Sequence, residues 1–310
     1  MKATVCTRWG PPEVLQLAEV ERPVPRKGEV RIRIVATAVT ASDCIARALR
    51  APARYRILAR LVMGWSGPRR PIFGMVFSGE VDLAGRTVRS FRPGDQVFGL
   101  SRWKAGCYAE YACYSANGII AAKPANLSHD EAAALPYGGL LALHILKKAA
   151  IRPGQRVLVY GASGAIGTAT VQLARHFGAR VTGVCSTRNL TLVESLGAEA
   201  VVDYTREDFT RRGERWDAIL DAVGRRKSAT ALLRAGDALA PGGRSISIDD
   251  DFPRARVDGL LLLKGLAESG KLEPVIDRRY PLEEIVAAHR YVEEGHKRGN
   301  VIVTVGHGDS

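Results

Sequence analysis

The segment from Gly161 to Gly167 constrains the fold of this chain more than any other, because its small residues stand between two different patterns. A short apolar run at 156–160 precedes it, and apolar residues at helical spacing follow it as far as Gly178. This order predicts a strand, a glycine turn and a helix. In such a turn a pyrophosphate can approach the backbone, and the helix N-terminus offers free N–H groups and partial positive charge. The alternative is a tight turn that binds nothing, but the flanking pattern favours a nucleotide site made of Gly161, Ala162, Ser163, Gly164, Ala165, Ile166 and Gly167.

The residues after the next strand indicate which dinucleotide would bind. A carboxylate about 20 residues beyond the glycine turn is typical of NAD sites, where it holds the ribose 2′-hydroxyl. The predicted strand at 180–184 leads instead to Ser186, Thr187 and Arg188. Hydroxyl and guanidinium groups donate hydrogen bonds to a phosphate, whereas a carboxylate would repel it. We therefore predict a preference for NADPH, with the alternative that Arg188 is an ordinary solvated residue at a helix start.

The hydrophobic periodicity changes near residue 123. Before this point short segments of alternating polarity predict strands, and residues 45–61 predict a helix followed by irregular chain. After it, Ser128 and Glu131 form a capping-box pattern at a helix start, and a second, longer helix is expected from Gly139 to Ala150. Strands expected at 200–202, 217–221 and 244–248 then alternate with helices, which is the pattern of a parallel α/β sheet. A helix at 282–293 and a strand at 301–305 are expected at the end.

Composition limits which binding partners and which cellular compartment we expect for this chain. No apolar run is long enough to cross a bilayer, and the first residues lack the apolar segment of a signal peptide, so we expect a cytoplasmic protein without a membrane partner. Five cysteines without a CxxC pair fit a reducing compartment. The net charge of +13 would suit a nucleic-acid-binding protein, but no such motif accompanies it. We prefer general use of arginine and attraction for a polyanionic cofactor, and do not expect nucleic acid as a partner.

Several short motifs follow one another in a specific order along nearly the whole chain. They are Gly10-Pro11-Pro12-Glu13-Val14, Val39-Thr40-Ala41-Ser42-Asp43, Pro93-Gly94-Asp95-Gln96-Val97, Tyr108-Ala109-Glu110-Tyr111, Ala132-Ala133-Ala134-Leu135-Pro136, the loop at 161–167, Leu239-Ala240-Pro241-Gly242-Gly243 and Tyr280-Pro281-Leu282-Glu283. In this combination the chain resembles a medium-chain dehydrogenase/reductase of the zinc-free quinone oxidoreductase (zeta-crystallin-like) branch. The resemblance implies a GroES-like catalytic β-domain at 1–122, a Rossmann NADPH-binding domain with a doubly wound parallel sheet at 123–257, and a return to the catalytic domain at 258–310. It places the site in the cleft between the two domains.

The resemblance also bears on metal and reaction. Zinc-dependent relatives need Cys, His and Glu ligands, but the family's catalytic Cys position falls near Ala41 and its Gly-His-Glu motif aligns with Gly74-Met75-Val76, so no metal is expected. Without a Lewis acid, substrates that are already activated by conjugation are favoured. The implied function is hydride transfer from NADPH to a quinone or an α,β-unsaturated carbonyl. The alternatives are an NADPH-dependent ketone or aldehyde reductase, similar to alcohol dehydrogenases, and a nucleotide- or RNA-binding protein without turnover.

Further cofactor contacts follow from the resemblance. Tyr204 matches a family tyrosine that can lie beside the 2′-phosphate, with the alternative that it only packs at a strand end. Ala222, Val223 and Gly224 resemble the segment that passes the adenosine-ribose side of the cofactor.

On the catalytic side the resemblance is less complete. Thr40 stands where the family often has a polar residue near the nicotinamide, which makes it the candidate donor to a developing oxyanion. The alternative is a buried structural threonine. Asp43 is expected to be a structural cap, and Ile45 and Leu141 stand where the family has hydroxyl groups.

The segment after Ile248 departs most from the family. One strand-and-crossover unit, about 30 residues by the usual size of such units, is missing before the leucines at 260–263, so we expect a Rossmann sheet shortened by one strand. The strand at 244–248 would then lie at the sheet edge, followed by Asp249, Asp250 and Asp251. Like charges there would repel a two-fold copy of the chain. We therefore expect a monomer, or a dimer formed through another surface.

Overall fold

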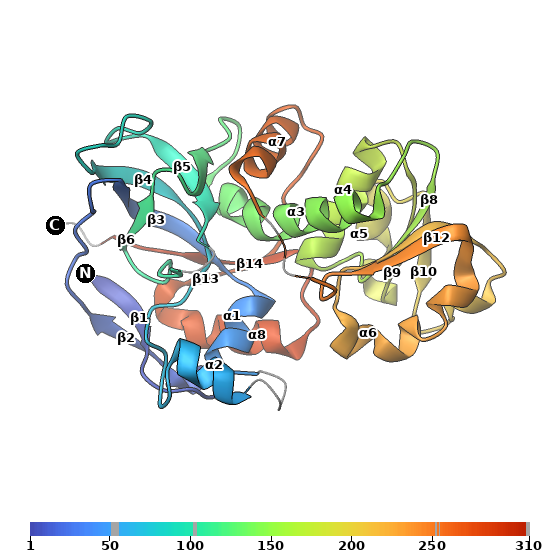
Figure 1. Ribbon diagram of the computed structural model, residues 1–310, viewed down its shortest axis with the longest axis horizontal. Helices are drawn as coiled ribbons and strands as arrows, with labels where there is room; N and C mark the ends of the chain where they lie inside the picture. The colour runs from blue at the N-terminus through green and yellow to red at the C-terminus, as the bar shows by residue number, and fades with distance from the viewer. Residues whose placement is uncertain (51–55, 102–103, 252, 254, 308–310) are drawn as a thin grey trace. The chain divides into compact units, whose positions relative to one another are not determined.

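The computed structural model describes residues 1–50, 56–101, 104–251, 253 and 255–307, and the chain forms two compact units (Figure 1). The first unit combines residues 1–136 with residues 276–310, and the second comprises residues 137–275. The second unit is therefore inserted into the sequence of the first. Its limits lie later in the chain than the boundaries of 122 and 257 that the sequence suggested.

A seven-stranded sheet organises the first unit. Its order is β13 (Ile276–Pro281), β14 (Asn300–Thr304), β3 (Glu29–Val39), β4 (Val76–Ala84), β5 (Gln96–Leu100) and β7 (Ile119–Ala122), and β6 (Tyr111–Ser115) pairs with residues 29–33 of β3. All of these pairs are antiparallel except β13 with β14. The alternation along β3 explains why it is a strand, since Ile32 and Ile34 enter the core while Arg31 and Arg33 pair with Asp82 and Glu80 of β4. A separate antiparallel pair joins β1 (Lys2–Cys6) and β2 (Leu15–Glu19).

In the described part of this unit, helices α1 (Ala41–Arg47), α2 (Arg56–Met63) and α8 (Ile285–Glu294) lie outside the sheet, in addition to the start of α3 (His129–Ala149). The first, α1, begins at a capping box in which Thr40 is the N-cap. The second, α2, follows, and α8 precedes β14. A helix followed by irregular chain is expected within residues 45–61. The helix is found but starts earlier, at the capping box of α1, and Leu49 has a left-handed φ of 46° after it. The expectation of irregular chain up to residue 61 is wrong, because the second helix, α2, forms there. Residues 51–55 of that range lie outside the described residues.

The second unit holds a five-stranded parallel sheet. Its order is β10 (Ala200–Asp203), β9 (Arg180–Cys185), β8 (Arg156–Tyr160), β11 (Trp216–Asp221) and β12 (Leu239–Ser247). The helices α4 (Ala165–His176), α5 (Leu190–Ser195) and α6 (Arg225–Leu232) connect successive strands, and α7 (Val257–Glu268) follows β12 (Figure 1). This is the doubly wound order of a Rossmann sheet. Among the described residues β10 and β12 are the two edge strands, and the position of β12 at an edge is the one expected for a sheet shortened by one strand.

The boundary between the units falls within one long helix, α3 (His129–Ala149). The capping box expected at its start is confirmed, because Ser128 N donates to Glu131 Oε2 at 2.8 Å and Glu131 N donates to Ser128 Oγ at 3.3 Å. A separate helix starting at Gly139 is not found, because the helix continues through Pro136. Proline removes one helical hydrogen bond and strains the preceding turn. Burial of neighbouring residues such as Ala133, Leu135 and Leu140 outweighs this loss.

Candidate functional site

The glycine loop lies at the carboxyl end of β8. Gly161 follows the strand with a left-handed φ of 77°, and the N–H groups of Gly161 and Ala162 donate to the Val184 carbonyl at 3.1 and 3.0 Å. The chain then turns into α4, whose N-cap is Gly164. No side chain caps this helix, so its first N–H groups point toward the loop without a side-chain acceptor, which is the arrangement that binds a phosphate.

The glycines of the loop have different surroundings. A Cβ on Gly167 would lie 2.1 Å from the Gly161 carbonyl oxygen, so this glycine allows α4 to pack closely against the loop. A Cβ on Gly161 would lie 2.2 Å from Val223 Cγ2. At Gly164 the closest atom to a Cβ would be the Gly161 oxygen at 3.7 Å, so this position borders open space. Only Gly164 therefore leaves room for a ligand to approach the backbone.

A buried asparagine joins this loop to the segment at 186–188. The Asn189 amide nitrogen donates to Ser163 Oγ at 3.0 Å and to Ser186 Oγ at 3.1 Å. Because both hydroxyls accept a hydrogen bond from the amide, each keeps its own hydrogen to donate elsewhere. Sequence reasoning missed Asn189. The sequence signal that could have found it is its position directly after the expected phosphate-binding residues, whereas its burial is visible only in the structure.

A carboxylate also lies beside this segment, at the end of β10. Asp203 is opposite Cys185 in the β9–β10 register, and its carboxylate accepts hydrogen bonds from the Thr187 hydroxyl and from Thr205 Oγ1 at 2.7 Å. The hydrogen bond from Thr187 lowers the pKa of Asp203, which keeps it charged. The expectation that no acid stands here is therefore incomplete. Thr187 directs its hydroxyl hydrogen to Asp203, whereas the Arg188 side chain is exposed.

Tyr204 continues from Asp203 along the same edge. Its N–H donates to the Cys185 carbonyl at 3.1 Å, and its ring is half exposed. The ring centroids of Tyr204 and Tyr160 are 6.5 Å apart, so Tyr204 stands near the end of β8, where the glycine loop begins. The structure thus brings together the residues at 161–167, 186–188 and 204 that the sequence assigned to one site.

The segment Ala222–Gly224 reaches the same edge from β11. Asp221, fully buried at the end of that strand, accepts hydrogen bonds from the N–H groups of Val223 at 3.0 Å and Gly224 at 3.1 Å. Its second oxygen accepts from the hydroxyls of Ser228 and Ser247, each at 2.7 Å. One carboxylate therefore holds the 222–224 segment, the start of α6 and the end of β12 in place. This anchor was also missed by sequence reasoning.

The expected catalytic residue, Thr40, belongs to the first unit. It is 4% exposed, and its hydroxyl donates to Asp43 Oδ2 at 2.6 Å while accepting from Asp43 N at 3.2 Å. The expectation that Asp43 caps a helix agrees with this capping box. Complete burial raises the pKa of Asp43 to about 6, against the opposing effect of the hydrogen bonds from Thr40. Donation from Thr40 to a substrate oxygen would need its hydroxyl hydrogen to leave Asp43, so its catalytic role stays a prediction.

Metal-binding side chains do not gather in the part of the chain that the structure describes, where no group of three or more His, Cys, Asp or Glu residues could hold an ion. Gly74 occupies the position aligned with the metal-binding motif, with a left-handed φ of 92°. A Cβ there would lie 2.6 Å from the Tyr108 ring, so this glycine has a packing role. The nearby Cys107 is fully buried, and its Sγ lies 2.9 Å from the Tyr114 hydroxyl.

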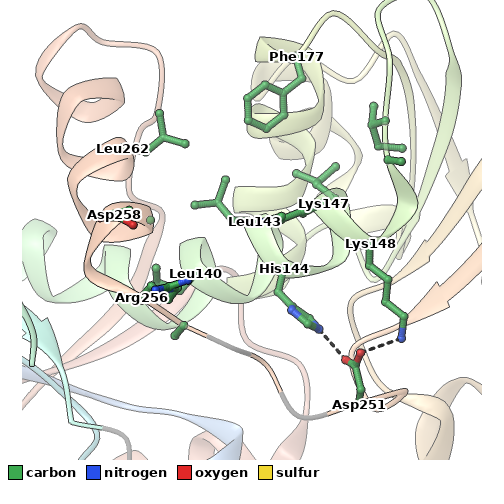
Figure 2. Close-up of a pocket in the computed structure, with 15 residues that line it drawn as sticks. Leu140, Leu143, His144, Lys147, Lys148, Phe177, Asp251, Arg256, Asp258 and Leu262 are labelled. Carbon is green, nitrogen blue, oxygen red and sulfur yellow. Dashed lines mark hydrogen bonds and ion pairs between the residues drawn. The ribbon is translucent and has the colours of Figure 1, made fainter.

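The second unit also contains a groove of about 1130 Å³ between α3 and α7 (Figure 2). Leucines from both helices and Phe177 line it, and Asp251 closes one end by pairing with His144 at 2.6 Å and Lys148 at 3.2 Å. No residue expected to contact the cofactor lines this groove.

Comparison with known protein families covers most of the chain. The family described as Alcohol dehydrogenase GroES-like domain matches residues 26–125. Two families described as Zinc-binding dehydrogenase match residues 165–249 and 253–303.

Individual relatives are similar over nearly the full length. The chain is 32% identical to a 2-methylene-furan-3-one reductase of Solanum lycopersicum, over 98% of this chain and 79% of that protein. It is 29% identical to the chloroplastic NADPH-dependent alkenal/one oxidoreductase of Arabidopsis thaliana, over the same shares of the two chains. Its fold is similar to the structure of the quinone oxidoreductase from Coxiella burnetii, with a TM-score of 0.83, 29% identity and 99% of each chain covered.

Proposed function

Because the chain belongs to the medium-chain dehydrogenase/reductase superfamily, in its quinone oxidoreductase branch, we propose that it transfers hydride from NADPH to a quinone or an α,β-unsaturated carbonyl. The names of the relatives support this reaction, since they are called a 2-methylene-furan-3-one reductase, an NADPH-dependent alkenal/one oxidoreductase and a quinone oxidoreductase. The observation on this chain that carries the proposal is Gly164, which borders open space at the uncapped start of α4.

The residues present fit a dinucleotide. The N–H groups at the start of α4, from Ala165 to Gly167, would face the pyrophosphate, with Gly161, Ala162 and Ser163 forming the turn before it. Val223, held by Asp221 and touching the same loop, would lie along the adenosine-ribose side together with Ala222 and Gly224. Bound NADPH would supply the hydride from C4 of its nicotinamide.

The 2′-phosphate would be held mainly by Ser186 and Arg188. Ser186 has a hydroxyl hydrogen to donate because its oxygen already accepts from Asn189, and Arg188 has an exposed guanidinium. Tyr204 would lie beside the phosphate. Thr187 would contribute less, since its hydroxyl donates to Asp203.

The substrate would be reduced without zinc. Within the described residues no metal-binding group exists, and the aligned motif positions are occupied by Ala41, Gly74, Met75 and Val76, of which none is an ordinary zinc ligand. A carbonyl without a Lewis acid is activated best by conjugation, which favours quinones and enones. Thr40 is the proposed donor to the developing oxyanion, and this role requires its hydroxyl hydrogen to turn away from Asp43 Oδ2. All five cysteines are unpaired, which fits the reducing conditions of the cytoplasm as the proposed compartment.

Turnover with a substrate panel tests the proposal. The purified chain is given NADPH with quinones, enones, or simple aldehydes and ketones, with and without a chelator, and loss of NADPH absorbance is followed. We expect oxidation with quinones or enones, unchanged by the chelator, and no stoichiometric zinc by elemental analysis. Turnover of simple aldehydes or ketones alone would favour the ketone or aldehyde reductase. Tight NADPH binding without turnover of any substrate would favour a non-catalytic nucleotide-binding protein, and one zinc per chain would contradict the zinc-free assignment.

A further inference from the structure

Helix α2 carries an apolar face that is turned to solvent rather than to the core. Five large apolar side chains form what we call the α2 face: Ile57, Leu58, Leu61, Val62 and Trp65, with 67%, 58%, 55%, 65% and 61% of their surface exposed. The spacing of Ile57, Leu58, Leu61 and Val62 places them on one side of α2, because residues four apart are neighbours on a helix surface. Trp65 follows two residues after the helix ends at Met63. A globular protein rarely exposes such a cluster without a partner for it.

The α2 face is fixed to the first unit at its C-terminal end. The Trp9 indole N–H donates to the Gly64 carbonyl at 3.1 Å, and Arg69 N donates to the Met63 carbonyl at 2.7 Å. Gly64 has a left-handed φ of 127° and a Cβ there would meet the Gly67 oxygen at 1.9 Å, so this turn is closely packed. The apolar side chains are therefore presented outward from an anchored segment.

The charges in the sequence segment that contains the α2 face have one sign. From Cys44 to Gly79 the sequence contains seven arginines and no lysine, aspartate or glutamate. Arg47 and Arg50 pair with Glu293 of α8. Arg69 and Arg70 lie in the segment after the helix, and both are exposed. The Arg60 guanidinium lies 5.8 Å from the centroid of the Trp65 ring. Aliphatic side chains beside a tryptophan and arginines are the composition of helices that lie in the interface of an anionic membrane.

We propose that the α2 face binds the surface of an anionic lipid bilayer. The apolar side chains would enter the boundary between headgroups and acyl chains, Trp65 would lie at headgroup level, and the exposed Arg69 and Arg70 would contact lipid phosphates. An eight-residue helix is about 12 Å long, so it lies on a membrane instead of crossing it. No helix in the described part of the chain has the length and apolar character of a membrane span. The proposal departs from the sequence expectation of no membrane partner, which was based on the lack of a spanning segment and did not consider binding at the membrane surface.

Nucleic acid fits the α2 face less well. A phosphodiester backbone is bound by cations and polar groups and gains nothing from isoleucine, leucine and valine beside them. A lipid surface would therefore lose affinity when the apolar side chains are replaced, whereas a polyanion such as nucleic acid would not. The experiment uses this difference.

Vesicle co-sedimentation of the full chain, without NADPH or substrate, tests the proposal. Vesicles of phosphatidylcholine alone are compared with vesicles containing about 30% phosphatidylglycerol, an anionic fraction large enough to attract basic segments. The test variant combines Leu58→Ser with Leu61→Ser, and the matched control is Leu233→Ser, because Leu233 in the second unit is 82% exposed. Circular dichroism and thermal unfolding establish that each variant is folded.

We expect binding to anionic vesicles that weakens with salt, falls at least about tenfold in the double variant and is unchanged in the control. Absence of vesicle binding, equal binding to neutral vesicles, or binding that survives the double substitution would each overturn the proposal. The last result would indicate a polyanion-binding surface. Light scattering without lipid provides a further test, since a dimer that dissociates in the double variant would identify a second copy of the chain as the occupant. Because no turnover is measured, failure here leaves the proposed hydride transfer unaffected.

Discussion

Gly164 and Gly167 stand three positions apart, yet a methyl group would affect them differently. Gly164→Ala places its Cβ at an ordinary 3.7 Å from the Gly161 oxygen and keeps the N-cap φ of −81°, so the free energy of unfolding should fall by less than about 1 kcal/mol. The methyl group would block the approach of a pyrophosphate, and NADPH affinity should fall at least about tenfold. Gly167→Ala drives a Cβ against the Gly161 oxygen and should lower the free energy of unfolding by about 1–3 kcal/mol. Isothermal titration with NADPH and thermal unfolding of both variants measure these two effects. A stable Gly164→Ala protein with normal NADPH affinity would contradict the assigned pyrophosphate site.

Arg188 should determine much of the preference between the two cofactors. We expect NADPH to bind more tightly than NADH. Arg188→Ala should reduce the difference between their binding free energies by about 1–3 kcal/mol, which is typical of a lost charge-assisted hydrogen bond. Arg211→Ala is the control, because Arg211 pairs with Asp208 within its own loop. Dissociation constants measured by fluorescence titration give the answer. Equal affinities for NADPH and NADH in the unmodified chain would contradict the assignment.

Asp43 should make the first unit less stable as pH rises. Its pKa is raised by burial from an ordinary 3.8 to about 6, so the folded chain holds this proton more tightly than the unfolded chain. The stability that the folded chain gains from the protonated Asp43 is present in full below pH 4 and is lost as pH rises through 6. This loss lowers the free energy of unfolding by about 3 kcal/mol. Asp43→Asn resembles the protonated side chain and should gain stability relative to the unmodified chain between pH 4 and 7.

Urea unfolding across this pH range, followed by a probe in the first unit, measures the effect. Asp237→Asn, which removes a carboxylate from an exposed position of the second unit, is the control for charge alone. A stability difference between Asp43→Asn and the unmodified chain that does not vary with pH would contradict the prediction.

At the scale of elements, Asp221 joins β11 to α6 and β12. Asp221→Ala removes the acceptor of four donors in a fully buried position and should lower the free energy of unfolding by about 3 kcal/mol or more. Asp221→Asn keeps one oxygen for the N–H groups of Val223 and Gly224 and should recover part of the loss. Urea unfolding compares the two variants, and equal stability of both with the unmodified chain would show that the carboxylate is not an anchor.

Local sequence patterns predicted those helices, strands and turns for which the conformational preference of adjacent residues agrees with their packing in the folded chain. The glycine loop, the capping box at Ser128 and the parallel strands follow from residues that are adjacent in sequence. Pro136 is a local stop signal that burial overrides, so the continuous α3 could not be foreseen. The hydrogen bond from Thr187 to Asp203 depends on the register of β9 with β10, which no pattern within either strand fixes. The roles of Thr40 and Arg188 remain predictions.

At the scale of the whole molecule, the β12 edge bears on assembly. Of the acids expected to repel a second copy, Asp250 pairs with Arg225 at 2.8 Å and Asp251 pairs with His144 and Lys148, so their charge is largely balanced within the unit. A different feature protects the edge, because Pro241 lacks an N–H group and Gly242 has a left-handed φ of 76° within β12. We still expect a monomer, or a dimer through another surface, as measured by light scattering. A two-fold dimer with β12 strands hydrogen-bonded across the axis would show this to be wrong.

The course of α3 through the unit boundary limits how independent the second unit can be. A fragment cut at residue 137 would begin in mid-helix, without the Ser128 and Glu131 side chains that satisfy the first N–H groups. Helix nucleation is the unfavourable step, so this fragment would keep the residues that propagate the helix and lose those that start it. The autonomy of the second unit is thus less than its compactness suggests, and a version meant to fold alone would have to start at Leu127 or earlier in the chain.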